Sequence, residues 1–575
     1  MENFNKLSFF LRKTDYYKIS LYFFLIFINF FLEILSVGLI FPIISLILDK
    51  NFFSENINFI QFILYYSPFK SFSENEHFQL ISFFLLIFVI VIFVKNMIAI
   101  YINFYRSNFT FLMLSDLKLK MISKYSKIRY LDSLKIKSSD VIVFVQNQLA
   151  RIVSIIENIL ILSLEFSVVF GIVIFLFLFD TYTSLLLVLA ICFFSLILVL
   201  FLKAKIFFYG EVRRKSEADL LFLTTNLISG LKEIKLSGFI KIFLNNFNYL
   251  SVRGLKANRN FNFISNFPRS YLEVIIALLI AIFFFVNLLR YEEINNSSIS
   301  SATIFLVSGI RILPSIGKII NSYNSYRYQI PTLDKIYKFS VLLNKIKEQK
   351  SKFIKCKKNI ELKNINFSYN NKKNVLENCN INISMGDKIG LYGASGSGKT
   401  TLINLISGLI KQTKGKIFID GFERSNFIIS NISIVSQNPL FINDTIKNNL
   451  NFVLNNNLVS NHQINSVLSY LDLNKVIKDL ENGIDTVIGE KGSKLSGGQL
   501  QRINIARAIL KKSDILILDE ATNALDKKTE KLVMQYLFKV FKNKIIIIIS
   551  HDKRLFNLCD YTLTINKKKI IKKNV

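Results

Sequence analysis

The sequence Gly-Ala-Ser-Gly-Ser-Gly-Lys-Thr at residues 393–400 decides the fold of the C-terminal half of the chain. It follows the apolar segment 388–392 and precedes the sequence Thr-Leu-Ile-Asn-Leu-Ile at residues 401–406, which is expected to be helical. A glycine-rich loop between a strand and a helix lets backbone N–H groups surround phosphate oxygens. The context therefore predicts a phosphate-binding loop in an α/β domain of the P-loop NTPase class.

The residue types in this loop suit a nucleoside triphosphate and its metal ion. The ammonium group of Lys399 is expected to reach the β- and γ-phosphates, and the hydroxyl of Thr400 is expected to bind Mg²⁺. The other predicted nucleotide contacts in and after the loop are Gly393, Ser395, Gly396, Ser397, Gly398 and Thr401.

Two further apolar segments lead into polar residues. Residues 515–520 read Ile-Leu-Ile-Leu-Asp-Glu, and the isoleucine run 545–549 is followed by Ser and His551. Such strands are buried on both faces of a parallel sheet, and their carboxyl ends meet at the edge where ligands bind. Asp519 therefore suits the outer shell of the metal, and Glu520 suits the base that orients or deprotonates the attacking water. His551 is a third candidate because of its position at a strand end.

Another motif resembles the signature of ABC ATPases. It is Leu-Ser-Gly-Gly-Gln at residues 495–499, followed by Ala-Arg-Ala at residues 506–508. The resemblance implies that Ser496, Gly498 and Gln499 contact the γ-phosphate of an ATP molecule held by the phosphate loop of a second copy. Two ATP molecules with Mg²⁺ are then expected between two ATPase domains. A homodimer would hold two complete sites.

The resemblance extends to other positions of the ATPase half. Gln437 resembles the Q-loop glutamine that couples the metal to the membrane domain, and Tyr369 resembles the aromatic residue that stacks on adenine. Residues 485–490 resemble the exporter-specific segment that touches the inner loops, and Asp526 resembles the D-loop aspartate. Asn523 departs from the family pattern, in which Ser is common. The metal-binding residues implied by all these motifs are Thr400, Gln437 and Asp519, and the catalytic residues are Glu520, His551 and Gln437.

The N-terminal half contains apolar segments long enough to cross a membrane, which takes about 20 residues. The segment 21–48 has Glu33 as its single charged residue and is too long for a signal peptide. The other predicted spans are residues 80–105, 152–179, 183–202, 271–289 and 300–317. The predicted protein is therefore multidomain, with an all-α, six-helix membrane domain at residues 1–330, a linker at 331–355 and the α/β ATPase domain at 356–575.

The charge of the loops predicts their side of the membrane, because basic loops stay in the cytoplasm. The segments 106–151 and 203–269 are rich in Lys and Arg. The loop 49–77, the turn at Asp180 and the loop near residue 292 contain few basic residues. Both termini are thus predicted to be cytoplasmic, in a multi-pass protein of the bacterial cytoplasmic membrane.

The two basic loops show helical periodicity with recurring Leu, Ile and Phe, which argues against disorder. Helices that continue some 20 residues past the bilayer would project about 30 Å into the cytoplasm. Their turns are expected near residues 130–140 and 229–238. In the outer loop, residues 59–66 form an aromatic, amphipathic stretch, interpreted either as a short helix in the membrane interface or as a loop that packs on the bundle.

Membrane spans ahead of an ATPase domain are similar to an ABC exporter half-transporter, which implies a second copy as partner and loop tips that act as coupling helices. The strings at residues 33–42, 230–235, 268–273 and 311–315 resemble bacterial lipid-linked oligosaccharide flippases. This resemblance implies transport of a lipid-linked glycan, with membrane lipids as further partners. An exporter of peptides, lipids or drugs shares every ATPase motif and is the alternative.

Charged residues within membrane spans are costly and usually face a cavity. They are Glu33, Lys95, Glu165, Glu273 and Arg311. Arg311, Lys95 and Glu33 are the candidate substrate-binding residues. Of these, Arg311 and Lys95 are expected to contact the pyrophosphate of a polyprenyl-linked glycan, because an arginine fork matches phosphate oxygens. Structural ion pairing, for instance of Glu33 with Lys95, is the competing interpretation.

The composition bears on other classes of protein. The net charge of +32 would suggest a nucleic-acid partner in a soluble protein. Lys, Asn, Ile and Phe are abundant together, however, and the basic residues flank apolar segments, so no nucleic acid is expected. The four cysteines form no CxxC pair, which indicates neither a metal site nor a disulfide framework. A soluble ABC protein would lack the spans, and a channel without turnover would be expected to lose Glu520 or His551.

Overall fold

The computed structural model describes residues 2–48, 76–179, 181–290, 296–346, 352–369, 373–424, 426–452 and 459–574. The chain divides into two compact units. One comprises Met1–Lys127 and Ile136–Ile346, and the other comprises Ile128–Lys135 and Lys347–Val575. The predicted outer stretch 59–66, the turn at Asp180 and the loop near residue 292 lie outside the described residues.

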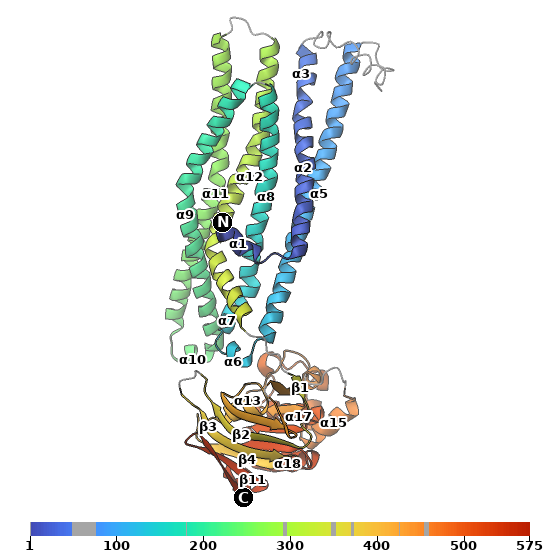
Figure 1. Ribbon diagram of the computed structural model, residues 1–575, viewed down its shortest axis with the longest axis vertical. Helices are drawn as coiled ribbons and strands as arrows, with labels where there is room; N and C mark the ends of the chain where they lie inside the picture. Colours follow the sequence, from blue (N-terminus) through green and yellow to red (C-terminus); the bar gives the residue numbers. More distant parts are fainter. Residues whose placement is uncertain are drawn as a thin grey trace. The chain divides into compact units, whose positions relative to one another are not determined.

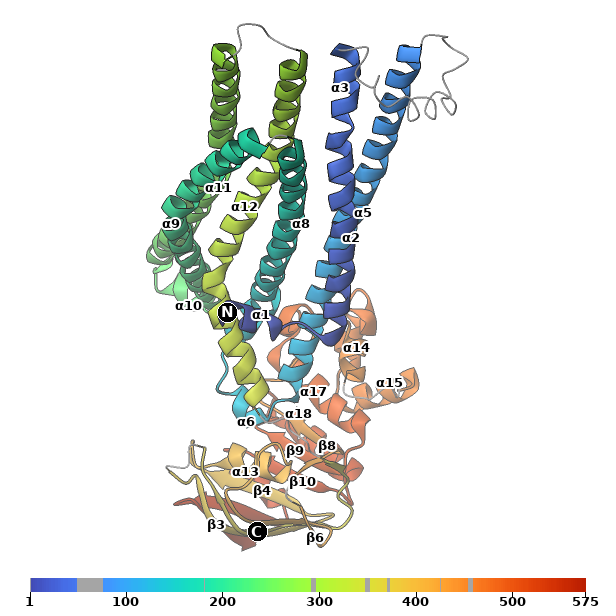
Figure 2. The same ribbon diagram turned by 45° about the horizontal axis from the view of Figure 1, so that its top comes forward.

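The first unit is helical, and six long helical passes occur among its described residues (Figure 1 and Figure 2). The first pass is α2 (Lys13–Gly38) continued by α3 (Ile40–Leu48), after the short α1 (Glu2–Ser8). The other passes are α5 (Glu76–Lys127), α8 (Leu149–Phe179), α9 (Thr181–Ser229), α11 (Ile240–Arg290) and α12 (Asn296–Lys345). The predicted all-α fold of this half is confirmed.

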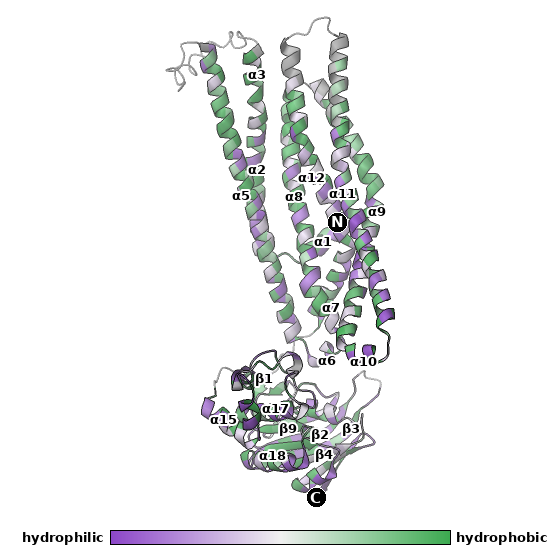
Figure 3. Ribbon diagram, turned by 180° about the vertical axis from the view of Figure 1, so that it is seen from behind, coloured by the Kyte–Doolittle hydropathy of each residue, from purple (hydrophilic) through white to green (hydrophobic). Residues whose placement is uncertain are grey.

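Five of the helical segments, searched over the described residues, are long and apolar enough to cross a membrane. They are Lys13–Ile47, His77–Lys127, Ser138–Leu178, Val188–Ser229 and Thr303–Lys345. The sixth predicted span, residues 271–289, lies within α11. Figure 3 shows that hydrophobic residues dominate the long helices, whereas hydrophilic residues become frequent in the parts of α9 and α11 next to α10 (Leu231–Leu236). The helices are thus longer than their apolar spans, as the sequence predicted.

Short helices lie at the turns between the long ones. α6 (Tyr130–Ser133) and α7 (Ser138–Val143) lie between α5 and α8, and α10 lies between α9 and α11. These positions coincide with the two predicted loop tips. The segment Ile128–Lys135, which includes α6, belongs to the second unit.

The linker predicted at residues 331–355 is wrong in its first part, because α12 continues through Pro331 to Lys345. Leu333, Ile336 and Leu343 are buried in a hydrophobic cluster of the first unit. These residues follow helical spacing, and the lysines between them lie on other faces of the helix. The change to a lysine-rich composition had concealed that periodicity.

The second unit contains three β-sheets. The largest has the strand order β12-β11-β4-β10-β9-β8, in which β12 pairs antiparallel with β11 and the other pairs are parallel. An antiparallel sheet has the order β3-β2-β5-β6, and β1 pairs with β7. The strands are β1 (Lys352–Ile354), β2 (Asn359–Phe367), β3 (Leu376–Ser384), β4 (Lys388–Gly393), β5 (Lys414–Ile419), β6 (Phe422–Glu423), β7 (Phe427–Ile429), β8 (Ile432–Val435), β9 (Ile515–Asp519), β10 (Ile545–Ile549), β11 (Tyr561–Asn566) and β12 (Lys569–Asn574).

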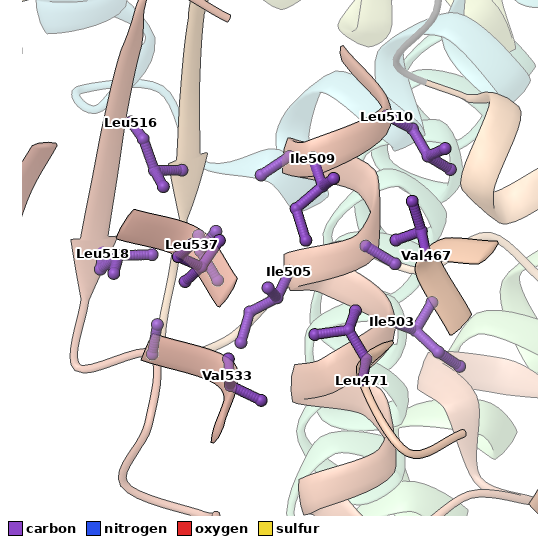
Figure 4. Close-up of a cluster of buried hydrophobic side chains, with 14 of the residues drawn as sticks. Val467, Leu471, Ile503, Ile505, Ile509, Leu510, Leu516, Leu518, Val533 and Leu537 are labelled. Carbon is purple, nitrogen blue, oxygen red and sulfur yellow. The ribbon is translucent and has the colours of Figure 1, made fainter. Parts of the chain in front are cut away.

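Helices of the second unit bury their apolar residues against the parallel sheet. They are α13 (Lys399–Ile406), α14 (Ile446–Asn451), α15 (Asn461–Tyr470), α16 (Asn474–Lys478), α17 (Gly497–Lys511) and α18 (Lys527–Val540). Figure 4 shows Ile505 of α17, Leu516 of β9 and Leu537 of α18 in one buried cluster. This core holds α17 and α18 against β9, and so fixes the loops that follow the strands.

The parallel strands carry the predicted polar residues to one edge of the sheet. Ile549 of β10 is paired with Asp519 of β9 and with Leu391 of β4. The residues that follow these strands therefore emerge together. The α/β fold and the buried strands predicted at residues 388–392, 515–519 and 545–549 are confirmed.

Candidate functional site

The glycine-rich loop lies between β4 and α13, as its sequence predicted. Gly396 and Gly398 have φ angles of 77° and 108°, a left-handed conformation that favours glycine. The Nζ atom of Lys399 donates hydrogen bonds to the carbonyl oxygens of Gly393 at 2.7 Å and Ala394 at 3.2 Å. The lysine ammonium is thus held over the loop at the N-terminus of α13, where backbone N–H groups favour an anion.

The loop fits a phosphate group. The hydroxyl of Ser397 is buried and has no hydrogen-bond partner among the described residues. A Cβ atom on Gly393 would lie 2.6 Å from the Ser397 Oγ, so the close approach of the backbone requires glycine. Ser395 and Thr400 are exposed on the loop and at the start of α13. A phosphate would supply an acceptor for the Ser397 hydroxyl, and Thr400 is open to a cation.

The Glu520 side chain is the centre of a hydrogen-bond cluster at the sheet edge. Its Oε2 accepts from Gln437 Nε2 at 3.0 Å and from Asn523 Nδ2 at 2.9 Å. Its Oε1 lies 3.1 Å from His551 Nε2. Three residues far apart in sequence, two of them predicted as catalytic, therefore surround the predicted base. Asn523, singled out in the sequence as a departure from the family pattern, contacts the same carboxylate.

The backbone of Glu520 is also constrained. Its φ angle is 51°, in the left-handed region that a glutamate rarely adopts. The Glu520 N–H donates to the Ile549 carbonyl at 3.0 Å, and Gln501 Nε2 donates to the Glu520 carbonyl at 3.1 Å. Strained backbone of this kind persists where the surroundings over-determine it, commonly at functional sites. No role was predicted for Gln501, although its position two residues after the signature motif could have indicated one.

Asp519 precedes Glu520 at the end of β9 and is half-buried. Burial raises the pKa of its carboxyl, the negative charge of Glu520 raises it further, and the Lys399 ammonium lowers it. The opposing effects of Glu520 and Lys399 place both charges near Asp519. A divalent cation between this carboxylate and a bound phosphate would stabilise the charged form, which suits Asp519 to the metal-binding role predicted for it.

Tyr369 lies beside the start of α13. Its hydroxyl is 3.0 Å from the hydroxyl of Thr401, and its ring meets that of Phe367 edge-on. Tyr369 also lines a cavity of about 490 Å³ that the segment containing α6 lines from another side, through Leu131 and Asp132. The first loop tip and the tyrosine predicted to contact adenine thus lie at one cavity.

The signature residues lie at the N-terminus of α17. Ser496 caps this helix: its hydroxyl accepts from the Gln499 N–H at 3.3 Å, and the Gln499 side chain accepts from the Ser496 N–H at 2.8 Å. A Cβ atom on Gly498 would lie 2.8 Å from the Ala524 carbonyl. Asp526 caps α18 by accepting from the Thr529 N–H, which lowers the pKa of the Asp526 carboxyl. The described structure does not bring Ser496 and Gln499 into hydrogen-bond contact with the glycine-rich loop.

The three charged residues that were predicted to bind the substrate form one cluster in the first unit. Glu33 of α2 pairs with Lys95 of α5 at 3.2 Å and with Arg311 of α12. Glu165 pairs separately with Lys318 at 2.7 Å. The ion pair of Glu33 with Lys95, named in the sequence as the competing interpretation, is therefore present. Arg311 also belongs to it.

A comparison with family models identifies the second unit. Residues 376–523 match the model described as ABC transporter. The matched segment contains the glycine-rich loop, Gln437, the signature sequence and the Asp519-Glu520 pair.

Similar proteins occur among transporters of bacteria and plants. An ATP-dependent lipid A-core flippase of Wigglesworthia glossinidia brevipalpis is 32% identical over 362 residues, 61% of this chain and 61% of that protein. A second ATP-dependent lipid A-core flippase, from Saccharophagus degradans, is 30% identical over 61% of this chain and 59% of its own length. ABC transporter B family member 21 of Arabidopsis thaliana is 37% identical over 37% of this chain and 17% of its own length. The chain thus spans about three fifths of the length of each of these two flippases.

A solved structure resembles almost the whole chain. It is a bacterial Atm1-family ABC exporter with ATP bound, and the match covers 97% of this chain and 95% of that chain with a TM-score of 0.74 and 17% identity. Fold and site together define an ABC-type P-loop ATPase domain joined to a bundle of membrane-length helices. The chain therefore has the fold of an ABC exporter, and the resemblance of its sequence to ABC exporters is confirmed.

Proposed function

We propose that this chain is an ATP-driven transporter of the exporter type, which works as a dimer of two identical copies. The observation that carries the proposal is the position of Glu520. Its carboxylate is oriented by Gln437, Asn523 and His551 at the sheet edge on which the phosphate loop also opens. This arrangement suits a base that orients a water molecule for attack on a γ-phosphate.

Within the site, each residue has a proposed part in ATP hydrolysis. Lys399 and the loop glycines hold the phosphates, and Thr400, Asp519 and Gln437 hold Mg²⁺, which neutralises charge on the phosphates when bound. Tyr369 stacks on adenine beside Thr401. His551 accepts or donates a hydrogen bond near the attacked phosphate, and its contact with Glu520 keeps the two side chains in register.

Dimerisation follows from the place of the signature. Ser496, Gly498 and Gln499 form an exposed helix N-terminus without contact to their own phosphate loop, whereas a second copy in antiparallel orientation could present the same residues to the γ-phosphate. Asp526, at the N-terminus of α18, lies on the loop that would cross between the copies. Each copy then completes the site of the other, and two ATP molecules are held per dimer.

ATP binding is proposed to drive transport by closing the two ATPase domains, because ATP binds the closed dimer better than the open one. The segment Ile128–Lys135 supports this coupling. It continues from α5, a helix long enough to cross the membrane, and belongs to the ATPase unit, where Leu131 packs against the hydrophobic core. Closure of the ATPase domains would therefore move α5 directly. Hydrolysis resets the transporter to its inward-facing state.

The chain is proposed to lie in the bacterial cytoplasmic membrane, with both termini and the α6 and α10 turns in the cytoplasm. The basic residues of the segments 106–151 and 203–269 support this orientation. The frequent hydrophilic residues of α9 and α11 near α10 agree with helices that continue beyond the bilayer.

The proposed substrate is a lipid-linked oligosaccharide, flipped between the leaflets. The strings that resemble oligosaccharide flippases support it, as do relatives that are named lipid flippases. Lys95 and Arg311 outnumber their shared partner Glu33, so the cluster keeps one excess positive charge for a pyrophosphate. The alternative to this proposal is export of a peptide, another lipid or a drug.

Reconstitution tests the proposal. The purified protein is placed in vesicles with a labelled lipid-linked glycan, and loss of label from the loading face is followed with and without ATP. The proposal expects ATP-dependent loss that Glu520→Gln abolishes and that the matched change Glu530→Gln, at a partly exposed position in the first turn of α18, leaves intact. ATP hydrolysis without movement of the glycan would overturn the proposed substrate. Absence of ATP hydrolysis would overturn the proposed function itself.

A further inference from the structure

The first unit contains a cavity of about 460 Å³ between α8, α11 and α12. Each helix lines it with residues one turn apart, such as Asn258 and Asn262 on α11 and Ser325 and Gln329 on α12. One face of each helix is therefore polar where three helices meet.

The wall of the cavity is held in place by contacts between the helices. The rings of Phe261 and Tyr328 stack at 3.8 Å with an interplanar angle of 7°. The Tyr328 hydroxyl donates to the side-chain oxygen of Asn258, and the Arg213 guanidinium lies 4.1 Å from the centroid of the Tyr328 ring. Arg213 also donates to Gln329 Oε1 at 3.0 Å. The cavity is thus preformed, which lowers the cost of ordering its residues on binding.

Several polar groups of the lining remain free for a ligand. Within the described part of the chain, the Asn262 carboxamide and the Ser325 hydroxyl make no hydrogen bond to protein. The Asn158 amide donates to the Ser154 carbonyl at 2.7 Å, which leaves the side-chain oxygen of Asn158 available. The cavity therefore offers both donors and acceptors, from different helices.

The chemistry of these groups selects the kind of ligand. Carboxamides and hydroxyls both donate and accept, as sugar hydroxyls do. Among the described lining residues, Glu157 alone carries a charge, and Arg106 lies 3.7 Å from it. A site for phosphate or for a peptide terminus would be expected to present an unpaired opposite charge. A neutral, amide-rich wall favours an uncharged, hydroxyl-rich group.

We propose that this cavity binds the sugar headgroup of the transported molecule before it crosses the membrane. The proposal rests on the proposed function, which supplies a substrate with such a headgroup. Asn262 precedes the predicted span 271–289 and Tyr328 follows the predicted span 300–317, at the ends assigned to the cytoplasm. The cavity therefore lies where a headgroup would be loaded. The Glu33 cluster, which shares only α12 with the cavity, remains the candidate for the charged linkage.

Two probes that differ only in the sugar test the assignment. The dimer in lipid nanodiscs is titrated with a polyprenyl diphosphate that carries a trisaccharide and with the same polyprenyl diphosphate without sugar. The ratio of the two dissociation constants isolates the contribution of the sugar, and a folding defect would alter both constants alike. The variants are Asn262→Leu and Ser325→Val, with Asn262→Gln and Asn246→Leu as controls. Asn246 is exposed on α11 and does not line the cavity.

The wild type is expected to bind the glycosylated probe about tenfold more tightly, or by about 1.4 kcal/mol, because the sugar adds hydrogen bonds to the lining. Asn262→Leu and Ser325→Val should each reduce the ratio about threefold to fivefold. Asn262→Gln, which keeps the carboxamide, and Asn246→Leu should largely preserve it.

The inference is overturned if the wild-type ratio is near one, or if Asn262→Leu and Ser325→Val weaken both probes equally. ATP turnover, measured on the same samples, separates this inference from the proposed function. ATP turnover together with a ratio of dissociation constants near one would contradict the sugar site alone. Lack of ATP turnover would contradict the proposed function.

Discussion

Two carboxylates, one in each unit, show how the surroundings of a charge decide its use. Glu520 is hydrogen-bonded by two uncharged carboxamides and a histidine, and 20% of its side chain is exposed. Glu33 lies between Lys95 and Arg311 and is 5% exposed. Neutral partners orient a carboxylate and leave its negative charge uncompensated, whereas two cations compensate that charge. Glu520 is therefore available to a water molecule, and Glu33 joins α2, α5 and α12.

The largest effect is expected for Glu520→Gln. This change keeps the size of the side chain and removes the base, so ATP turnover should fall about a thousandfold, while ATP binding persists and traps the closed dimer. The thermal unfolding temperature should change little, because among the described residues His551 alone could pair with this carboxylate as a cation. Turnover at the wild-type rate would remove Glu520 from its assigned role.

Glu33→Gln is the counterpart in the membrane unit. The change leaves the buried Lys95 and the partly buried Arg311 without a carboxylate, and removal of one partner from a buried ion pair costs about 3 kcal/mol. The protein should therefore unfold at a lower temperature in nanodiscs, whereas Glu520→Gln should leave the unfolding temperature almost unchanged. The additional change Lys95→Met should restore part of the stability. Equal stability of Glu33→Gln and the wild type would show that the cluster is not structural.

Arg311→Ala distinguishes a structural pair from a substrate contact. Arg311 is the most exposed member of the cluster, with 25% of its side chain accessible. Its loss should lower transport of the labelled glycan several-fold, by about 1–2 kcal/mol, and lower ATP turnover less. Lys95 still neutralises Glu33 in this variant. Parallel loss of transport and turnover would assign Arg311 to structure alone.

The smallest effect is expected at Asn523. Asn523→Ala removes one hydrogen bond from an uncharged donor to the Glu520 carboxylate, at an exposed position where it is worth about 1 kcal/mol, so turnover should fall about fivefold. Asn523→Ser introduces the residue common in the family and should lose less. The ATP dependence of turnover is measured for both. Full activity of Asn523→Ala would show that Gln437 and His551 suffice to orient the carboxylate.

Much of the ATPase unit could be predicted because its signals are local. The isoleucine run 545–549 is buried along its whole length, and Asp519 and Glu520 follow directly from the strand that precedes them. The left-handed backbone of Glu520 was not predictable, because it depends on hydrogen bonds to Gln501 and Ile549 from other elements.

The membrane unit was less predictable in its contacts than in its helices. Apolar length indicates a span, and the pairing of Glu33 with Lys95 was one interpretation of two buried opposite charges. The addition of Arg311, 278 residues from Glu33, depends on how α12 packs. The error at residues 331–345 has a similar cause, because the buried contacts of Leu333 and Ile336 are with distant elements.

The central claim is that two ATP molecules are enclosed between two copies of the chain, and the mass of the nucleotide-bound complex tests it most directly. Native mass spectrometry of Glu520→Gln, saturated with ATP and Mg²⁺, should show two chains with two nucleotides. A single chain that binds ATP in this variant, together with undiminished turnover by wild-type protein kept monomeric, would contradict the account.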